Sequence, residues 1–504
     1  MGGNTENIPS MPNLPAWKPR ELEILKLLAK GLTNTEIGAR IHLSHETIRW
    51  YNKKIFEKLG ARNRTEAVKR AAALGLIRGG KKPERSPVRY GRNGDTHLAY
   101  QTIGSGPIDL LFIHGFISHL DLAWENHEFT EFFERLGEFC RVILFDKRGV
   151  GLSDRGQGAP TLEETIEDAN CVLDAVASKR TFVMGTSEGA AAAVLLASSH
   201  PDRVAGLVLY GATPKVVRSG ASPHWAATEE QFDAMLARMQ DTWGGPWALE
   251  SFAPSRARDE SFRTWWAKVL KSASSPSSIR DVLNLVRKVD ICQLLPQIRV
   301  RTLVIHKNQD RLVNPDAGRY FAQHMPNAQW LDLPGKDHIY FVDSEGIVNA
   351  VRNFLEENPA GDVADTRISI IICAKVQAAI PQKAIQNILL AQQSRFISLT
   401  GDEIIATFDS PTRAVQCAKA ILSKAADKNI KISLHVGECF TANSQPLDYV
   451  AEQSRKALEY ASNGEILLTQ TLHDILAGSR LSLQQRSDTV ETIVPNSMVL
   501  YTLI

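Results

Sequence analysis

A pattern of short apolar runs, each followed by a turn and a helical stretch, recurs through the middle of the chain. It is seen in "IDLLFIHGF" (108–116), "RVILFDKRGVGLSD" (141–154), "TFVMGTSEGAAAAVLLA" (181–197) and "RVAGLVLYGA" (203–212). Apolar strands that alternate with helices are typical of parallel sheets buried on both faces. The pattern therefore predicts a doubly wound, mostly parallel sheet, with a ligand site beyond the carboxyl ends of its strands.

Two segments rich in Gly, Pro and charge lie on either side of this region. "RGGKKPERSP" (78–87) and "NPAGDVADT" (358–366) contain few apolar residues and are typical of linkers. A chain of 504 residues also exceeds what one hydrophobic core usually serves. We therefore expect a multidomain protein, with domains over residues 15–78, 88–357 and 367–504.

The composition excludes several classes of protein. Hydrophobic residues make up 43% of the chain and charged residues 23%, which is ordinary for a globular protein. No run of eighteen apolar residues occurs, and the start "MGGNTENIPSMPNLPAW" has neither the basic nor the apolar region of a signal peptide. The six cysteines are scattered without a C-x-x-C pair. We expect a cytoplasmic protein without a membrane span, metal site or cofactor.

The first predicted domain is helical and basic. Residues 15–82 contain 16 Lys or Arg and six Asp or Glu, a balance that suits a nucleic-acid partner. "KPRELEILKLLAKG" (18–31) has apolar residues at helical spacing and ends in glycine. A later helix can begin after Ser44, with a stripe of apolar residues on one face.

Residues 18–71 resemble the DNA-binding domain of LuxR-type transcription regulators over its whole length. "TNTEI" (33–37) and "KLGARNRTEA" (58–67) carry the resemblance. It implies an all-α helix-turn-helix domain that binds double-stranded DNA through its third helix. The implied groove-facing residues are Arg49, Trp50 and Lys53, and the candidate phosphate contacts are Lys54, Lys58 and Arg64. Trp50 departs from the small or polar residue common there. The alternative is a basic helical bundle that binds a protein.

The segment "GTSEG" (185–189) fits the pattern Gly-x-Ser-x-Gly between an apolar strand and a helix rich in alanine. The two glycines permit a sharp turn, which exposes Ser187 as a candidate nucleophile above the amino end of the helix. The backbone amides of Phe116 and Glu188 are the candidates for an oxyanion hole.

An acid and a histidine follow the serine in the order that a catalytic triad on this kind of sheet requires. Asp310 comes after the apolar run "TLVIHK" (302–307), and His338 follows "AQWLDL" (328–333). The acid would orient the imidazole, and His338 would take the proton of Ser187. Residues 88–357 resemble the α/β-hydrolase superfamily, which implies an ester-like substrate. The serine argues against dehalogenase and epoxide-hydrolase members.

Several other polar residues of this domain fit structural roles. We expect His114 and Asp337 to lie in turns and His200 to end a helix. In "DKRGVGLSD" (146–154), the charged side chains are expected to brace a loop.

A helical stretch over residues 214–292 predicts a cap inserted in the hydrolase-like domain. It contains five of the nine tryptophans: Trp225, Trp243, Trp247, Trp265 and Trp266. Aromatic side chains above a polar triad indicate a pocket for an apolar or amphipathic small molecule. The alternative is that each tryptophan packs the cap on the core.

The C-terminal part resembles the class III nucleotidyl-cyclase domain from Leu399 to about Leu481. The resemblance implies an α+β, ferredoxin-like domain. The family's chemistry needs two metal-binding aspartates. Asp402 matches the second, whereas Lys375 stands nearest the place of the first and Glu403 and Ser398 also depart from the family pattern. We expect a degenerate domain without cyclase activity, which serves dimerisation or regulation.

Two functions remain open at this stage. In the first, the protein is a homodimeric transcription regulator whose hydrolase-like domain senses, and can slowly hydrolyse, a small ligand. In the second, it is a serine esterase with accessory DNA-binding and scaffold domains. The DNA-binding domain favours the first, and the complete set of triad residues keeps the second open.

Overall fold

The computed structural model describes residues 17–29, 31–74, 76, 82–156, 158–218, 223–358, 365–377, 380–424, 429–486 and 499–504. Residues 78–81 of the first predicted linker and 359–364 of the second lie outside these ranges, as do residues 219–222 of the predicted cap and residues 1–16. The chain divides into two compact units, Met1–Lys82 and Pro83–Ile504.

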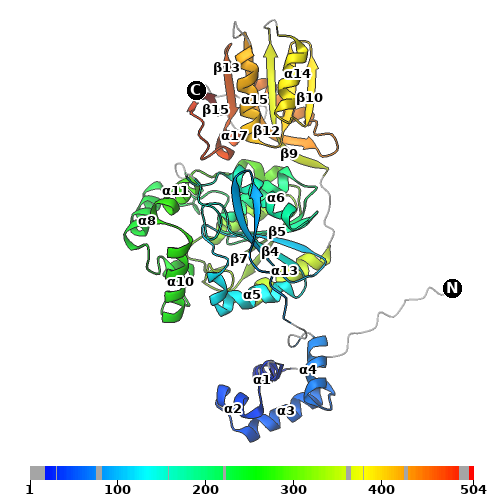
Figure 1. The fold of residues 1–504 in the computed structure, drawn as a ribbon, viewed down its shortest axis with the longest axis vertical. Coiled ribbons are helices and arrows are strands. Elements are labelled where there is room, and N and C mark those ends of the chain that lie inside the picture. The colour runs from blue at the N-terminus through cyan, green and yellow to red at the C-terminus, as the bar shows by residue number, and fades with distance from the viewer. Residues whose placement is uncertain are drawn as a thin grey trace, which may run out of the picture. The chain divides into compact units, whose positions relative to one another are not determined.

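The first unit is a small helical domain. Its described helices are α1 (Pro19–Ala29), α2 (Asn34–Ile41), α3 (His45–Leu59) and α4 (Arg64–Ala73) (Figure 1). Thr33 and Glu36 form a capping box that starts α2, and the Ser44 hydroxyl accepts a hydrogen bond from the Thr47 amide at the start of α3. Both caps stabilise the amino ends of the two helices and fix the turn between them.

The second unit contains an eight-stranded mixed sheet in the order β1-β2-β4-β3-β5-β6-β7-β8. The strands are β1 (Arg89–Asn93), β2 (Thr96–Ile103), β3 (Asp109–Ile113), β4 (Arg141–Phe145), β5 (Thr181–Thr186), β6 (Val204–Tyr210), β7 (Thr302–Lys307) and β8 (Ala328–Leu333). β1 and β2 pair antiparallel, and all pairs from β4 to β8 are parallel. The predicted mostly parallel sheet is confirmed.

Helices cover both faces of this sheet. On one face, α6 (Leu162–Ala175), α7 (Gly189–Ser199) and α12 (Pro315–His324) pack against β3, β5 and β6 in one apolar cluster. On the other, α5 (His127–Gly137) and α13 (Glu345–Glu357) form a second cluster with the opposite side chains of the same strands. The doubly wound arrangement follows from strands that are apolar on both faces.

The segment between β6 and β7 is helical, and it lies within the range predicted for a cap. It contains α8 (Glu229–Thr242), α9 (Leu249–Phe252), α10 (Glu260–Ala273) and α11 (Pro276–Val286), of which α8, α10 and α11 are labelled in green in Figure 1. Apolar residues of α8, α9 and α10 belong to the same cluster as α5 and α13. The cap is therefore packed on the α5 side of the sheet.

A second sheet of seven strands follows in the same unit, in the order β10-β11-β9-β12-β13-β15-β14. Its strands are β9 (Thr366–Val376), β10 (Phe396–Thr400), β11 (Glu403–Phe408), β12 (Ile430–Phe440), β13 (Glu465–Thr469), β14 (Leu483–Gln485) and β15 (Leu500–Leu503), and its helices are α14 (Gln382–Ala391), α15 (Pro411–Lys424), α16 (Asp448–Glu459) and α17 (Gln470–Ile475). The Arg367 guanidinium donates to the Ser199 carbonyl at the end of α7. The hydroxyl of Thr412 donates to Glu163 on α6 at 2.5 Å. The second sheet thus contacts the helices of the first.

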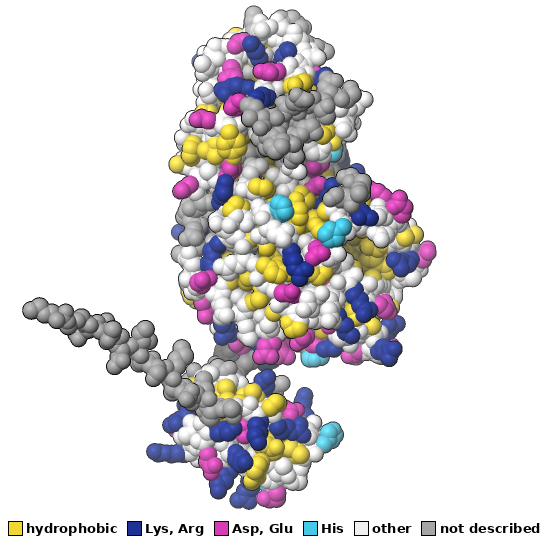
Figure 2. Space-filling model, turned by 180° about the vertical axis from the view of Figure 1, so that it is seen from behind, with side chains coloured by type: hydrophobic (Ala, Val, Ile, Leu, Met, Phe, Trp, Pro, Cys, Tyr) yellow, Lys and Arg dark blue, Asp and Glu magenta, His cyan; other side chains and the backbone are white. Residues whose placement is uncertain are grey.

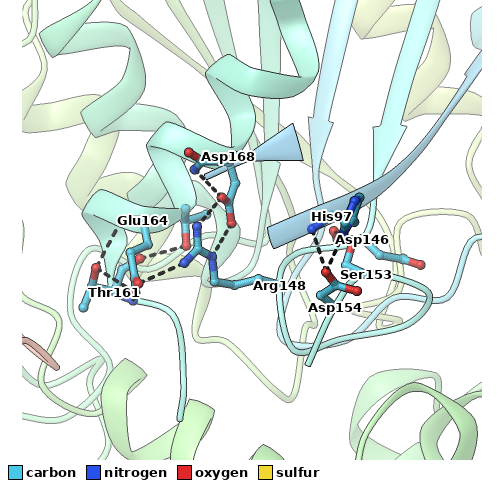
Figure 3. Close-up of polar contacts among 10 residues, drawn as sticks. His97, Asp146, Arg148, Ser153, Asp154, Thr161, Glu164 and Asp168 are labelled. Atoms are coloured by element: carbon cyan, nitrogen blue, oxygen red, sulfur yellow. Dashed lines mark hydrogen bonds and ion pairs between the residues drawn. The ribbon is translucent and has the colours of Figure 1, made fainter. Parts of the chain in front are cut away.

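A polar network braces the loop that follows β4, as Figure 3 shows. Arg148 reaches Asp168 of α6 through two hydrogen bonds of 2.6 and 2.8 Å. Asp154 accepts a 2.8 Å hydrogen bond from the His97 amide on β2. The buried carboxylate of Asp146 accepts from the Ser118 hydroxyl and from the Leu120 and Leu152 amides. These contacts fit the bracing role that the sequence predicted.

Candidate functional site

Ser187 occupies a sharp turn between β5 and α7. Its φ of 52° lies in the left-handed region, which a residue other than glycine rarely adopts. A side chain at Gly185 would meet Ala190 and Ala193 at 2.8 Å, and one at Gly189 would meet the carbonyl oxygens of Ile113 and His114 at 2.6 Å. The two glycines are therefore required by the close packing of the turn against β3 and α7.

His338 and Asp310 are joined by a hydrogen bond. The distance between His338 Nδ1 and Asp310 Oδ2 is 2.7 Å. The other carboxylate oxygen, Oδ1, accepts from the amides of Leu312 and Val313, which fixes the carboxylate plane. Burial by itself raises the pKa of Asp310, but the facing imidazoles of His338 and His306 outweigh it and hold the pKa well below its usual range. Asp310 is thus charged at neutral pH.

Ser187 and His338 line the same pocket, at the carboxyl ends of the central strands. Among the described residues, no hydrogen bond joins the Ser187 hydroxyl to the imidazole. Catalytic hydrogen bonds are often long in a free enzyme and tighten when substrate binds. The structure therefore brings the serine, the histidine and the acid to one place, with the bond between histidine and acid already made.

The pocket has mostly aromatic and aliphatic walls and encloses about 770 Å³ of empty space, including its open mouth. One wall comes from the loop after β3, which includes His114 and Phe116. Another comes from the cap, and a third from the segment after His338. The cap and post-histidine residues are Phe252, Trp265, Trp266, Val269, Ile339, Tyr340 and Phe341. Such a wall suits an apolar or amphipathic small molecule.

Of the five tryptophans predicted to line the pocket, the structure places Trp265 and Trp266 there. The prediction for the other three needs correction. Trp225 packs on Tyr320, with ring centroids 5.4 Å apart, beside α12. Trp243 donates its indole N–H to the Ser274 carbonyl, and Trp247 packs behind Phe116 and Phe252. Trp225 and Trp247 thus pack the cap segment on the rest of the domain, Trp243 binds within the cap, and none of the three lines the pocket.

Phe116 lines the same pocket as Ser187, and Glu188 follows the serine in the chain. Phe116 follows Gly115, and a Cβ atom added at Gly115 would lie 3.4 Å from Ser187 Cβ. Glu188 is the residue that starts α7. Neither amide donates a backbone hydrogen bond to any of the described residues. The Glu188 amide instead contributes a hydrogen bond to the carboxyl group of its own side chain.

The sequence interpretation missed two groups at this site. His306, fully buried on β7, places Nε2 3.2 Å from Asp310 Oδ2. The sequence indicates His306 only by its position, four residues before Asp310. Phe252 contributes to the pocket from α9, and its ring lies 5.9 Å from that of His338. No pattern around Phe252 distinguishes it from other cap residues.

The candidate DNA-contacting face lies on α3. Arg49, Trp50, Lys53 and Lys54 are exposed there, and the Trp50 side chain is 52% exposed. Lys54 Nζ lies 4.0 Å from the centre of the Trp50 ring. Lys and Arg side chains are numerous on the surface of this unit in Figure 2. An exposed face of this composition suits a nucleic acid.

Two of the six predicted DNA-contacting residues also contact helix α1. Lys58 Nζ lies 2.5 Å from the carboxylate of Glu21, a buried residue of α1. Arg64 donates to the Leu28 carbonyl at the end of α1, at 2.7 Å. Both side chains thus hold α1 in place, and their contact with DNA stays a prediction.

In the second sheet, Asp402 lies opposite a cation. Lys375 on β9 places Nζ 3.6 Å from Asp402 Oδ2, and Arg455 holds Glu403 at 2.7 Å. No group of three or more potential metal ligands occurs within the described ranges. The carboxylates of Asp402 and Glu403 are thus each paired with a cation of the protein.

Comparison with known families identifies both kinds of domain. Residues 18–71 match the model of the bacterial regulatory proteins of the luxR family, and residues 110–345 match the α/β-hydrolase fold model. The chain therefore carries a LuxR-type DNA-binding domain fused to an α/β-hydrolase domain. No described helix is long and apolar enough to cross a membrane.

The relatives of the hydrolase domain are enzymes. The pimeloyl-[acyl-carrier protein] methyl ester esterase of Chromobacterium violaceum is 28% identical over 272 residues, which are 52% of this chain and 98% of the esterase. The 2-hydroxymuconate semialdehyde hydrolase of Pseudomonas putida is 29% identical over 231 residues, which are 45% of this chain and 80% of that enzyme. Among solved structures, an esterase from Exiguobacterium antarcticum is 22% identical and covers 53% of this chain and 98% of its own, with a TM-score of 0.47.

Proposed function

We propose that the protein is a cytoplasmic transcription regulator whose hydrolase domain binds, and slowly hydrolyses, a small apolar or amphipathic ester-like ligand. The observation that carries this proposal is the pocket, whose walls come from the sheet loops and from cap helix α10 together. A ligand that fills it contacts both Ser187 and the cap. Its occupancy can therefore bias the position of the cap, and through it the rest of the chain.

The chemistry follows from the geometry of the three side chains. Asp310 holds the imidazole of His338 with Nδ1 protonated, which leaves Nε2 free to take the proton of Ser187. The serine oxygen then attacks the ester carbonyl, and the amides of Phe116 and Glu188 stabilise the negative oxygen that forms. Water subsequently releases the acyl group with His338 as base.

Reactivity of Ser187 is tested by labelling the full chain with a fluorophosphonate. We expect labelling of the wild type, none in Ser187→Ala, and a rate reduced by about 10²–10⁴ in Asp310→Asn, because the amide no longer fixes the required tautomer. A Trp225→Phe variant serves as control, since Trp225 does not line the pocket. Absence of labelling in the folded wild type would contradict the catalytic assignment.

We also propose that the second sheet belongs to a degenerate, cyclase-like domain that contributes to a homodimer. The order β10-β11-β9-β12, with α14 and α15 between successive strands, supports a ferredoxin-like core. A two-fold operator, usual for helix-turn-helix regulators, calls for a dimer. Sedimentation of the full chain at the mass of one copy, with and without DNA, would contradict this part of the proposal.

The second candidate function is a serine esterase with accessory domains. The specific observation in its favour is the bond between His338 and Asp310, which a protein that only senses a ligand does not require. Hydrolysis of a short nitrophenyl ester at an ordinary enzymatic rate, with no effect of pocket occupancy on DNA binding, would favour this function.

A further inference from the structure

A second cavity lies behind the serine turn, on the side away from the catalytic pocket. It encloses about 590 Å³ of empty space, including its mouth, and its lining shares no residue with the first pocket. Ser187 lines the first cavity, and the next residue, Glu188, lines the second. The turn between β5 and α7 thus separates two cavities.

Most of the wall of this second cavity is apolar. Cap helix α11 and the segment after it contribute Val282, Leu285, Val286 and Val289, and the opposite wall comes from β3, α6 and α7. Two of the polar residues in the wall already have partners within the protein. The Thr213 hydroxyl donates to the Lys215 carbonyl, and Lys215 Nζ pairs with Asp290 at 2.7 Å.

Lys147 and Glu188 are different, because one carboxylate oxygen of Glu188 has no hydrogen-bond partner and Lys147 Nζ is the cation that faces it. The distance between Lys147 Nζ and Glu188 Oε1 is 4.0 Å, too long for a hydrogen bond. Glu188 Oε1 is buried without a hydrogen-bond partner, although the Ser187 side chain and the Glu188 amide contribute hydrogen bonds to the same carboxyl group. Burial raises the pKa of Glu188 and lowers that of Lys147, as expected for a poorly solvated pair.

The backbone on both sides holds this pair in place. Lys147 follows β4 in the loop that Arg148 ties to α6, the network drawn in Figure 3. Glu188 is fixed by the turn that Gly185 and Gly189 permit. The two charged side chains therefore start from fixed backbone and leave a space between them at the end of an apolar cavity. Such an arrangement has the form of a ligand site.

We propose that this cavity is a second small-molecule site, for a neutral ligand with a short apolar body and a hydroxyl or primary amide head. One oxygen or amide group can lie at about 2.8 Å from both charged atoms, accepting from Lys147 and donating to Glu188. The apolar body then contacts α11. The site goes beyond the proposed function, because it needs neither Ser187 nor DNA.

The test uses butanamide as the probe and saturation-transfer NMR on the full chain. We expect transfer to butanamide but not to pentan-2-one, which has as many non-hydrogen atoms and accepts hydrogen bonds but cannot donate one. Val282→Phe should abolish the transfer by filling the cavity, and Val269→Phe, which narrows the catalytic pocket instead, should leave it.

Lys147→Met provides a second test that does not depend on filling the cavity. It replaces the side chain by an unbranched one that is a single atom shorter and removes the donor, so the transfer to butanamide should be lost. No transfer in the wild type, equal transfer in Val282→Phe, or equal transfer to pentan-2-one would each overturn the proposal. Unchanged transfer in Lys147→Met would overturn the assigned role of the charged pair.

Discussion

One ion pair joins two helices of the DNA-binding unit. Glu21 on α1 is buried, and its carboxylate accepts from the Lys18 amide at 3.0 Å and from Lys58 Nζ on α3 at 2.5 Å. Burial raises the pKa of Glu21, but these two partners outweigh it and lower the pKa below its usual value. Lys58 is thus a structural residue of the unit.

Lys58→Ala should therefore lower the stability of this unit by about 1–3 kcal/mol, because it leaves a buried carboxylate without its cation. Faster amide hydrogen exchange in α1 and α3 at pH 7 would show this, with Lys69→Ala, exposed on α4, as control.

Because the pKa of Glu21 is lowered, its contribution to stability is present above about pH 4.3 and is lost as the pH falls through the lowered pKa. The difference between Lys58→Ala and wild type should shrink accordingly. Equal exchange at pH 7 would contradict this role.

Sequence patterns identified the residues whose place follows from chain order. Ser187 was predicted from two glycines between a strand and a helix, and Asp310 and His338 from their positions after later strands. The partners of charged or aromatic side chains could not be predicted in this way. The sequence shows that Lys58 and Arg64 are basic, but only the packing of α1 shows that Glu21 and the Leu28 carbonyl bind them.

Among the elements, helix α3 presents two unlike faces. Ile48, Ile55 and Leu59 are buried in the unit's core, whereas Arg49 and Lys53 are exposed on the opposite side. This division was visible in the sequence, because helical spacing determines which residues share a face. The exposed face is the part of the unit that can enter a groove of DNA.

Arg49→Ala or Lys53→Ala should weaken binding to a DNA duplex selected from a random library by about 1–3 kcal/mol if the residue reads a base. Lys69→Ala on α4 should have a smaller effect, common to all sequences. Fluorescence anisotropy at fixed salt measures the affinities. Selected-duplex affinities unchanged in both α3 variants would contradict the assignment of this face.

The strands, like the faces of helix α3, could be predicted from the sequence, but their order in the sheet could not. Apolar runs predicted the strands and their parallel direction, but the order β2-β4-β3-β5 depends on contacts between residues distant in the sequence, such as Leu111 with both Ile143 and Val183. No local pattern contains that order. The same limit applies to the cap, where helical spacing predicted helices but not which tryptophans face the pocket.

Strands β9 and β11 place Lys375 beside Asp402 in the second sheet. In the cyclase-like domain that we propose, Lys375 stands nearest the place of the first of the two metal-binding aspartates that nucleotide cyclisation needs. Purified full chain with ATP or GTP and Mg²⁺ or Mn²⁺ should therefore give no cyclic nucleotide. Product above a heat-inactivated control, lost in Asp402→Ala, would contradict this expectation.

At the scale of the whole molecule, the second unit is continuous from the catalytic turn to the second sheet. α7 begins at the serine turn and ends at Ser199, whose carbonyl accepts from Arg367 of β9. The cap is contacted as well, because a side chain at Gly478 would meet Leu285 of α11 at 2.2 Å. Helices α7 and α11, which both line the second cavity, thus also contact the C-terminal part of the chain.

The central claim is that occupancy of the catalytic pocket changes DNA binding. The most direct measurement is the affinity of the full chain for the selected duplex before and after complete reaction of Ser187 with a fluorophosphonate, with Ser187→Ala treated in parallel. We expect a change of about 1–3 kcal/mol in the reacted wild type and none in the variant. An unchanged affinity of the fully reacted wild type would contradict the claim and leave the esterase as the function of this domain.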